Sequence, residues 1–143
     1  MQTEAYGPFM QRFGEVVSGP PQLIHVDFNS PGSLSKALSA PITEIATFYF
    51  DGEPPSDYGS GVEKAEQWIG DGDGYLGSAW GTTYEEVERE GVKGKAAVVV
   101  IGWQSYEKHM AFRAREDFRE KIGMLRGGSK AIEMHHVAMM QAL

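Results

Sequence analysis

The most constraining feature of this sequence is an uninterrupted apolar run over residues 96–101, Ala-Ala-Val-Val-Val-Ile. Residues 95–103 are therefore predicted to form a strand, because a short run rich in β-branched residues favours extended backbone. A strand with apolar side chains on both faces must be covered from both sides. We therefore expect this segment to be a central strand of a sheet, and the rest of the chain must supply its neighbours and its cover.

The sequence from residue 41 onward predicts a regular order of elements around that strand. Strands are predicted over residues 43–50, 75–82, 95–103 and 131–140, and helices over residues 58–70 and 106–125. The predicted strands are rich in β-branched and aromatic residues, whereas the predicted helices repeat apolar residues three or four positions apart. The acidic residues 83–91 are interpreted as a surface turn of helix or a loop. The order β-α-β-β-α-β is the ferredoxin-like arrangement, so the predicted fold class is α+β.

The first forty residues form a separate segment in this interpretation. A helix is predicted over residues 6–17 and a strand over residues 22–28. When the first forty residues are shifted forward by 109 positions, Phe9 aligns with Phe118 and three further positions also match. The segment is therefore either the remnant of a preceding repeat or a chance similarity. The predicted organisation is an N-terminal helix and strand over 1–28, a serine-rich linker over 29–40 and a ferredoxin-like domain over 41–143.

Composition excludes several classes of function. The chain has 143 residues and no cysteine, which rules out disulfides, thiolate nucleophiles and cysteine-ligated metals. Its 13 Lys and Arg against 20 Asp and Glu give a net charge of −7, which disfavours nucleic-acid binding. No apolar run is long enough to cross a bilayer, and the N-terminus lacks the pattern of a signal peptide. We therefore expect a cytoplasmic protein with neither nucleic acid nor membrane as partner.

The segment over residues 101–113, IGWQSYEKHMAFR, resembles the dimeric α/β-barrel superfamily. A strand that ends in Gly-Trp, a serine cap and a helix with His-Met-x-Phe-Arg carry the resemblance, which is strongest to the fungal type of antibiotic-biosynthesis-monooxygenase-like domains. Residues 133–137, EMHHV, are similar to the closing strand of those proteins, and the resemblance covers residues 41–140. It implies a ligand cavity between sheet and helices, and two four-stranded sheets packed face to face. Members of the superfamily include cofactor-free oxygenases of aromatic polyketides in secondary metabolism, cyclases, isomerases and haem-degrading enzymes.

The predicted topology also indicates a partner, independently of the resemblance. A ferredoxin-like sheet carries helices on one face, so its other apolar face must be buried against another layer. A second copy of the chain is the expected partner, because two-fold symmetry is the commonest way to supply such a layer. We therefore expect a homodimer that associates through its sheet faces.

Two of the three catalytic candidates are histidines. His135 and His136 are adjacent on a predicted strand, so they point to opposite faces. His136 shares its face with Met134 and is favoured for the cavity, where burial would lower its pKa and leave a neutral imidazole able to act as a base. The alternative is a core histidine satisfied by a backbone or carboxylate partner. His109 lies on a helix face with Tyr106, and it is a second acid/base candidate if that face meets the sheet, or a surface residue if the face meets solvent.

Tyr49 is the remaining catalytic candidate, since a phenol in an apolar cavity can hydrogen-bond a ligand carbonyl and hold a developing oxyanion. The alternative is a tyrosine that is buried for packing, with its hydroxyl satisfied locally. Aromatic and thioether side chains would form walls suited to a flat apolar ligand, or would simply pack the core. The predicted ligand-binding residues are Phe48, Trp80, Trp103, Tyr106, Phe112, Met134 and His135.

These candidates predict an enzyme that acts on an aromatic or polyketide-type small molecule without metal or flavin. His136 or His109 would remove a proton next to a carbonyl, and Tyr49 with the other histidine would hold the enolate oxygen, leading to oxygenation, cyclisation or isomerisation. No metal site is predicted, because the adjacent histidines diverge and no ligand spacing is present. The alternatives are a non-catalytic stress-type or ligand-carrier barrel, and a haem-binding barrel, which needs an axial histidine open to a large cleft.

Overall fold

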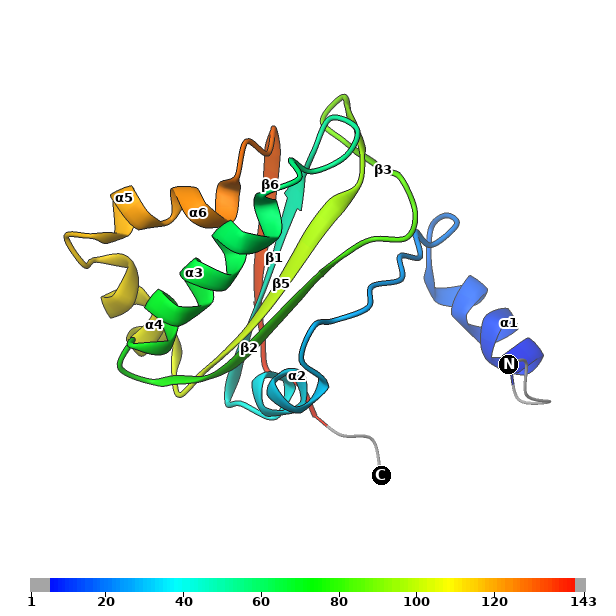
Figure 1. The fold of residues 1–143 in the computed structure, drawn as a ribbon. Coiled ribbons are helices and arrows are strands. Elements are labelled where there is room, and N and C mark those ends of the chain that lie inside the picture. Colours follow the sequence, from blue (N-terminus) through cyan, green and yellow to red (C-terminus); the bar gives the residue numbers. More distant parts are fainter. Residues whose placement is uncertain (1–5, 141–143) are drawn as a thin grey trace.

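The structure is a computed structural model that describes residues 6–140, and these residues are organised around one four-stranded antiparallel sheet (Figure 1). In spatial order its strands are β2 (Tyr75–Thr82), β5 (Ala96–Trp103), β1 (Ile42–Tyr49) and β6 (Ala131–Val137). The two central strands are therefore the first and third of the β-α-β-β-α-β unit, which is the ferredoxin-like order. Every residue of β5 is buried, as the apolar run predicts.

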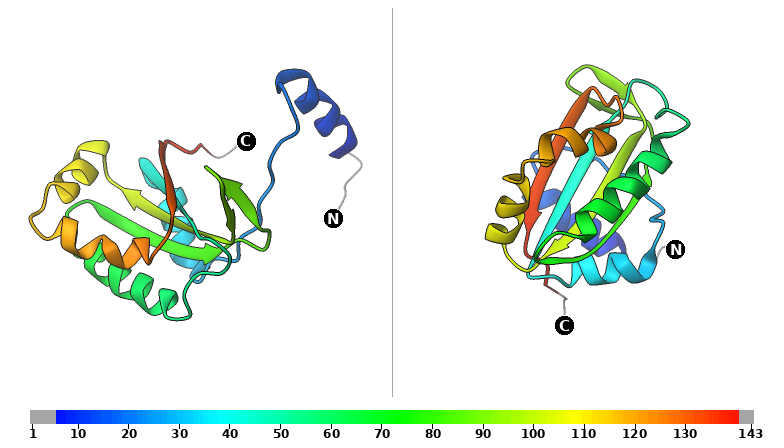
Figure 2. Two further views of the ribbon diagram at one scale, coloured as in Figure 1. Left: turned by 90° about the horizontal axis from the view of Figure 1, so that it is seen from above. Right: turned by 60° about the vertical axis from the view of Figure 1, so that its left-hand side comes forward.

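Figure 2 shows helices covering one face of the sheet. They are α3 (Tyr58–Gly70), α4 (Tyr106–Arg113), α5 (Phe118–Lys121) and α6 (Gly123–Arg126). The helical spacing of α3 buries the predicted apolar stripe, and Val62 and Ala65 are fully buried within it. The main core lies between these helices and the sheet, and it includes Phe48, Trp68 and Trp103.

The predicted single helix over residues 106–125 is wrong, because α4, α5 and α6 are separate short helices. Phe112 and Phe118 both pack on the ring of Trp68, with ring centroids 4.7 and 5.8 Å away. On one continuous helix these two phenylalanines would point about 120° apart around the axis, so the break lets both reach the same ring. Asp117 holds the turn in place: it accepts hydrogen bonds from Arg115 and from Nε1 of Trp68.

The predicted linker over residues 29–40 is also wrong, since it contains the helix α2 (Pro31–Leu38), which packs on the opposite face of the sheet. Proline suits the first position of a helix because its missing N–H would be unpaired there in any case. Ala37 is fully buried against Gly102, where an added Cβ would lie 2.8 Å from the Cα of Ala37. The hydroxyl of Thr43 donates a hydrogen bond to the carbonyl of Ala37 at 2.8 Å.

The predicted strand over residues 22–28 does not form either, although the segment does lie along the edge of the sheet. Val26 makes one isolated antiparallel bridge to Thr83, and the amide of Asn29 donates to the carbonyl of Trp80 at 2.9 Å. The preceding Pro-Pro pair has no N–H to donate to a ladder, which restricts pairing upstream. This segment and α2 cover part of the second sheet face, so the expectation of helical cover on only one side is wrong.

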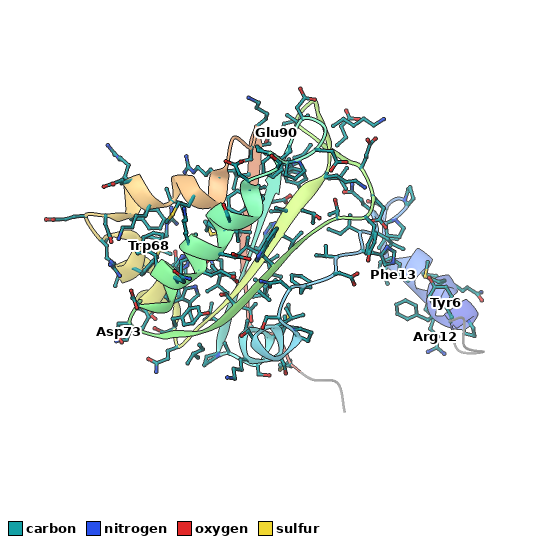
Figure 3. The ribbon with its side chains drawn as sticks, in the orientation of Figure 1. Tyr6, Arg12, Phe13, Trp68, Asp73 and Glu90 are labelled. Carbon is teal, nitrogen blue, oxygen red and sulfur yellow. The ribbon has the colours of Figure 1, made fainter. Side chains whose placement is uncertain are left out.

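The predicted N-terminal helix is present as α1 (Tyr6–Val16), and none of its residues is buried. Its aromatic side chains contact each other rather than the sheet, with Phe9 and Phe13 stacked at 5.9 Å. Figure 3 shows Tyr6 and Phe13 on a helix that stands apart from the sheet and its cover.

The acidic segment over residues 83–91 begins as a loop, as one alternative predicts, but from residue 87 it forms part of a hairpin. Its strands are β3 (Val87–Arg89) and β4 (Val92–Gly94). The two residues between them, Glu90 and Gly91, have positive φ angles of 53° and 79°. Such a pair suits a two-residue hairpin turn whose twist matches that of the strands.

Within residues 6–140, no helix is long and apolar enough to span a bilayer.

We expect Ala37→Leu to lower the free energy of unfolding by about 1–3 kcal/mol, because overpacking a filled site forces side chains and backbone to shift. Ala37 faces Gly102 without spare room, so the added carbons cannot be accommodated where α2 meets β5. Urea denaturation followed by circular dichroism measures the change. Ser35→Leu is the matched control, since Ser35 is exposed on the same helix, and an equal loss in both variants would contradict this packing role.

Candidate active site

A cavity of about 90 Å³ lies between the helix-covered face of the sheet and helices α3 to α6. Most of its lining is apolar and comes from the main core. Four predicted ligand-binding residues line it: Phe48, Trp103, Phe112 and Met134. Its polar lining consists of Glu44, His109, Arg113 and Arg126. Typical small-molecule sites have about 300–1,000 Å³, so a ligand of more than a few heavy atoms must displace side chains of the cover.

Glu44 provides a buried carboxylate at one end of this cavity. Strand alternation points it to the same face as Ala46 and Phe48, and it is only 7% exposed. Its Oε2 accepts a hydrogen bond from Nε1 of Trp103 at 3.0 Å. Burial raises the pKa of Glu44 to about 7, against the opposing effects of the Trp103 hydrogen bond and the positive charge of Arg113. Near neutral pH this carboxyl group is therefore present in both protonation states.

His109 lies next to Glu44, with its Nε2 3.2 Å from Oε2 of Glu44. Ser105 caps α4 by accepting a hydrogen bond from the amide of Lys108 at 3.1 Å, which fixes where the helix begins. The helix then points His109 at the sheet, where its ring stacks on Trp103 with centroids 4.8 Å apart. Burial, followed by the charges of His136 and Arg113, lowers the pKa of His109 to about 4. The imidazole is therefore neutral at physiological pH.

His136 continues the contact toward the surface. It pairs with Glu44 across the β1–β6 ladder, so both side chains point to the same face. Its Nε2 lies 2.7 Å from Nδ1 of His109, and the ring of Tyr106 meets its ring edge-on at 5.1 Å. Burial, then the charge of Arg113, lowers the pKa of His136. The helix face that carries His109 therefore meets the sheet rather than solvent.

Glu44, His109 and His136 form one chain of close polar contacts, in which His109 and His136 are hydrogen-bonded and Glu44 lies 3.2 Å from His109. We call it the Glu-His-His chain. With Glu44 ionised, Nε2 of His109 carries the proton that faces the carboxylate, and Nδ1 of His109 then accepts a hydrogen bond from Nε2–H of His136. With Glu44 protonated, the proton on His109 moves to Nδ1, the bond between the two histidines is reversed, and His136 then carries its proton on Nδ1. The two arrangements differ by one proton, which enters at Glu44 and leaves at His136. This chain can therefore carry a proton between the cavity and the half-exposed His136.

Two predicted site residues lie on the opposite face of the sheet. The hydroxyl of Tyr49 donates to Oε2 of Glu133 at 2.9 Å, and Oε1 of Glu133 lies 2.9 Å from Nε2 of His135. The expectation that Tyr49 and His135 contact the ligand of this cavity is therefore wrong. The reason is strand alternation, because Tyr49 and His135 each follow a residue that points into the helix-covered core. Burial and the Glu133 hydrogen bond raise the pKa of Tyr49 to about 12.

Trp80 is on the helix-covered face but does not line the cavity. Its ring lies 3.4 Å from the Cβ position of Gly59 and meets the ring of Tyr58 edge-on at 5.9 Å. This places it at the beginning of α3, so its expected role in ligand binding is wrong. Tyr106 flanks His136 instead of lining the cavity wall.

Glu44, Arg113 and Arg126 were absent from the sequence-based site. Glu44 carries a recognisable signal, since it is a charged residue two positions before Ala46 on the face that a central strand buries. Arg126 is the last residue of α6, a short helix that the sequence does not separate from α4, so its position could not be predicted. Among residues 6–140, no three or more His, Asp or Glu side chains cluster as metal ligands would.

No protein-family model matches this sequence, and no curated protein matches it. Solved structures do match in fold. A variant of SnoaB, a cofactor-independent oxygenase from Streptomyces nogalater, is 18% identical, with a TM-score of 0.51 over 71% of this chain and 95% of that chain. At3g17210 from Arabidopsis thaliana is 14% identical, with a TM-score of 0.55 over 72% of this chain and 99% of that chain.

A third similar structure extends over more of this chain. It is a candidate monooxygenase from Fusobacterium nucleatum, 13% identical, with a TM-score of 0.54 over 92% of this chain and 58% of that chain. At these identities the likeness establishes a common fold. It confirms the ferredoxin-like fold that the resemblance to the dimeric α/β-barrel superfamily implied.

Proposed function

We propose that this chain, which has the fold of a cofactor-independent oxygenase and of other ferredoxin-like proteins, removes a proton from a carbon that a carbonyl group acidifies and lets dioxygen react there. The observation that carries this proposal is the Glu-His-His chain at the end of an apolar cavity. The fold of SnoaB, which is named a cofactor-independent oxygenase, supports the same class of reaction. The substrate class is a small aromatic compound with an enolisable carbonyl group.

Glu44 is the proposed general base. A base is most effective when its pKa is near the working pH, and burial brings the pKa of Glu44 to about 7. The protonated carboxyl group then donates to Nε2 of His109, and the proton leaves through His136. Because both imidazoles are neutral at this pH, each can accept a proton on one nitrogen as it releases one from the other.

Arg113 is the proposed partner of the developing enolate oxygen, in place of Tyr49. It is the last residue of α4 and lines the cavity. Its charge lowers the pKa values of Glu44, His109 and His136, which supports a position close to all three. A cation at the rim of an apolar cavity can stabilise negative charge that appears only during the reaction.

The reaction with dioxygen consumes one O₂ for each substrate. The C–H proton passes to Glu44, and the carbanion gives its electron pair to dioxygen in one-electron steps that form a C–O bond. The peroxide takes a proton to become a hydroperoxide, which loses water and leaves a new carbonyl group. A CH₂ group thereby becomes C=O, with one oxygen atom in the product and the other in water.

Two assays on the purified full chain separate proton removal from oxygenation. In D₂O under argon, proton NMR of 2-tetralone measures exchange at the carbon next to the carbonyl. In air, an oxygen electrode and the absorbance of anthraquinone measure oxidation of anthrone. We expect catalysed exchange in the first and equimolar oxygen uptake in the second. Exchange without uptake would restrict the function to isomerisation or cyclisation, and absence of both would exclude the proposal.

The rate of exchange is expected to rise with pH through a midpoint near 7, because only the ionised carboxylate of Glu44 accepts a proton. His109 stays neutral across this range, since its pKa is about 4. Rates measured from about pH 5 to about pH 9 give the midpoint. Trp103→Phe removes a hydrogen bond that lowers the pKa of Glu44, so the midpoint should move to higher pH. An unchanged midpoint would show that another group is the base.

One observation favours the non-catalytic alternative, in which the chain is a ligand carrier: the cavity measures only about 90 Å³. In that case a ligand would bind without exchange of its C–H protons. The haem-binding alternative finds less support, because both ring nitrogens of His109 already face partners inside this small cavity. A second copy that packs on the sheet face bearing Tyr49 and His135 remains our proposal for the partner of this chain.

A further inference from the structure

Two guanidinium groups border the cavity of an acidic protein. Arg113 and Arg126 are the last residues of α4 and α6, and both line the cavity while remaining exposed at its rim. Arg89 and Arg115 have carboxylate partners, but within residues 6–140 no carboxylate lies within 4.0 Å of Arg113 or Arg126. Their charges are therefore free to meet an anion that enters the cavity.

The two arginines lie at opposite ends of the cavity floor. On β1 and β6 the floor follows three residue pairs, Glu44–His136, Ala46–Met134 and Phe48–Ile132, of which all residues except His136 line the cavity. Successive strand residues rise by about 3.3 Å, so the first and last pairs are about 13 Å apart. His109 contacts the first pair, and Arg113 follows it by one turn of α4 and lines the cavity. The charge of Arg113 lowers the pKa values of Glu44, His109 and His136, which supports a position near this pair.

Arg126 lies over the other end of the floor. Two hydrogen bonds near it show this: the hydroxyl of Tyr58 donates to the carbonyl of Leu125 at 2.7 Å, and the amide of Lys130 donates to the carbonyl of Tyr49 at 2.8 Å. Tyr49 directly follows Phe48 on β1. The middle of the floor, between the two arginines, is apolar.

We propose that the cavity selects an aromatic carboxylate, with the carboxylate bound by Arg126 and the reacting carbonyl group placed about two ring widths away, beside Arg113 and Glu44. This inference rests on the proposed function for the position of the reacting carbonyl. An arginine fork matches the two oxygens of a carboxylate, and a rigid aromatic body fits the apolar middle of the floor. Such a ligand would displace the half-buried Phe118 and Ile122 of the cover.

The test compares two ligands of equal shape, 2-naphthoate and 2-naphthamide, by isothermal titration calorimetry on the full chain. We expect naphthoate to bind about tenfold more tightly, and added salt to reduce this preference, because the site is open to solvent. Arg126→Gln should abolish the preference. Arg119→Gln is the matched control, since Arg119 is exposed on α5 and does not line the cavity.

Three outcomes would overturn this assignment. They are equal binding of both ligands, failure of naphthoate to bind, and loss of the preference in Arg113→Gln but not in Arg126→Gln. Glu44→Gln separates the two proposals, because it should lose proton exchange while keeping the preference for naphthoate. If exchange depends on Glu44 but naphthoate is not preferred, the proposed function stands and the carboxylate class is wrong.

Discussion

Glu44→Gln should lower kcat/KM for proton exchange by about 10²–10⁴-fold, the range that a positioned general base contributes. Glutamine keeps the shape of the side chain and can still accept the hydrogen bond from Trp103. It cannot take up a proton, however, so the Glu-His-His chain loses its entry point. Exchange of 2-tetralone protons in D₂O, followed by NMR, measures the loss without dependence on the dioxygen step.

Glu133→Gln is the matched control for this prediction. Glu133 is also a sheet carboxylate, but it points to the opposite face and contacts Tyr49 and His135. It should retain wild-type exchange. The free energy of unfolding shows whether a loss of exchange comes from misfolding. Because burial raises the pKa of Glu44, the wild-type protein loses stability as the pH rises toward 7, and glutamine removes this loss. The Glu44→Gln variant should therefore be at least as stable as the wild type near pH 7. A Glu44→Gln variant that exchanges protons at the wild-type rate would exclude Glu44 as the base.

Trp103→Ala should lower the free energy of unfolding by about 3–5 kcal/mol, the usual cost of deleting a large buried aromatic side chain. Trp103 is fully buried at the end of the all-buried strand β5, and its ring packs against His109 and Phe112. Its removal also deprives the buried carboxyl group of Glu44 of a hydrogen-bond donor. Urea denaturation at fixed pH measures the change.

Comparison with Trp103→Phe divides this loss into two parts. Phenylalanine keeps most of the buried ring but lacks the Nε1–H group, so it should cost clearly less than alanine. Tyr106→Ala is the exposed control, since Tyr106 is 49% exposed on the neighbouring helix, and it should change stability by less than about 1 kcal/mol. Equal losses in the alanine and phenylalanine variants of Trp103 would mean that the hydrogen bond, not packing, dominates.

The architecture of the sheet was predictable because its signals are local and periodic. The six apolar residues 96–101 predict a strand covered on both sides, and β5 is buried at every position. Alternation alone separates His135 from His136, and the structure has them on opposite faces of β6. These predictions need no knowledge of what the strand packs against.

The helical cover was less predictable because tertiary packing overrides local propensity there. The sequence from Tyr106 to Leu125 is compatible with one helix. The chain is nevertheless interrupted there, because Phe112 and Phe118 both pack on the ring of Trp68. Serine-rich sequence around Pro31 favours a linker, but the absence of a side chain at Gly102 creates the space in which α2 packs. Such long-range fits are not encoded in any single window of the sequence.

The site was predictable in part for the same reasons. His109 and His136 were candidates because imidazoles stand out in a sequence with only four histidines. Glu44 was missed, since acidic residues are common and a single one in a strand normally faces solvent. Only the strand register brings it opposite His136. Tyr49 was assigned to the wrong face. Phe48 points into the helix-covered core, so alternation along the strand already directs its neighbour Tyr49 to the opposite face.

The pairing of β1 with β6 has a consequence for insertions and deletions. A slip of β6 by one residue would bring His135 opposite Glu44 in place of His136, so an imidazole would still be available. The same slip would drive Glu133 into the apolar floor in place of Met134. The bond from Tyr49 to Glu133 opposes this, since it holds the carboxylate on the far side of the sheet. Glu133 has no part in the proposed chemistry, yet its hydrogen bond with Tyr49 thus maintains the β1–β6 register that pairs Glu44 with His136.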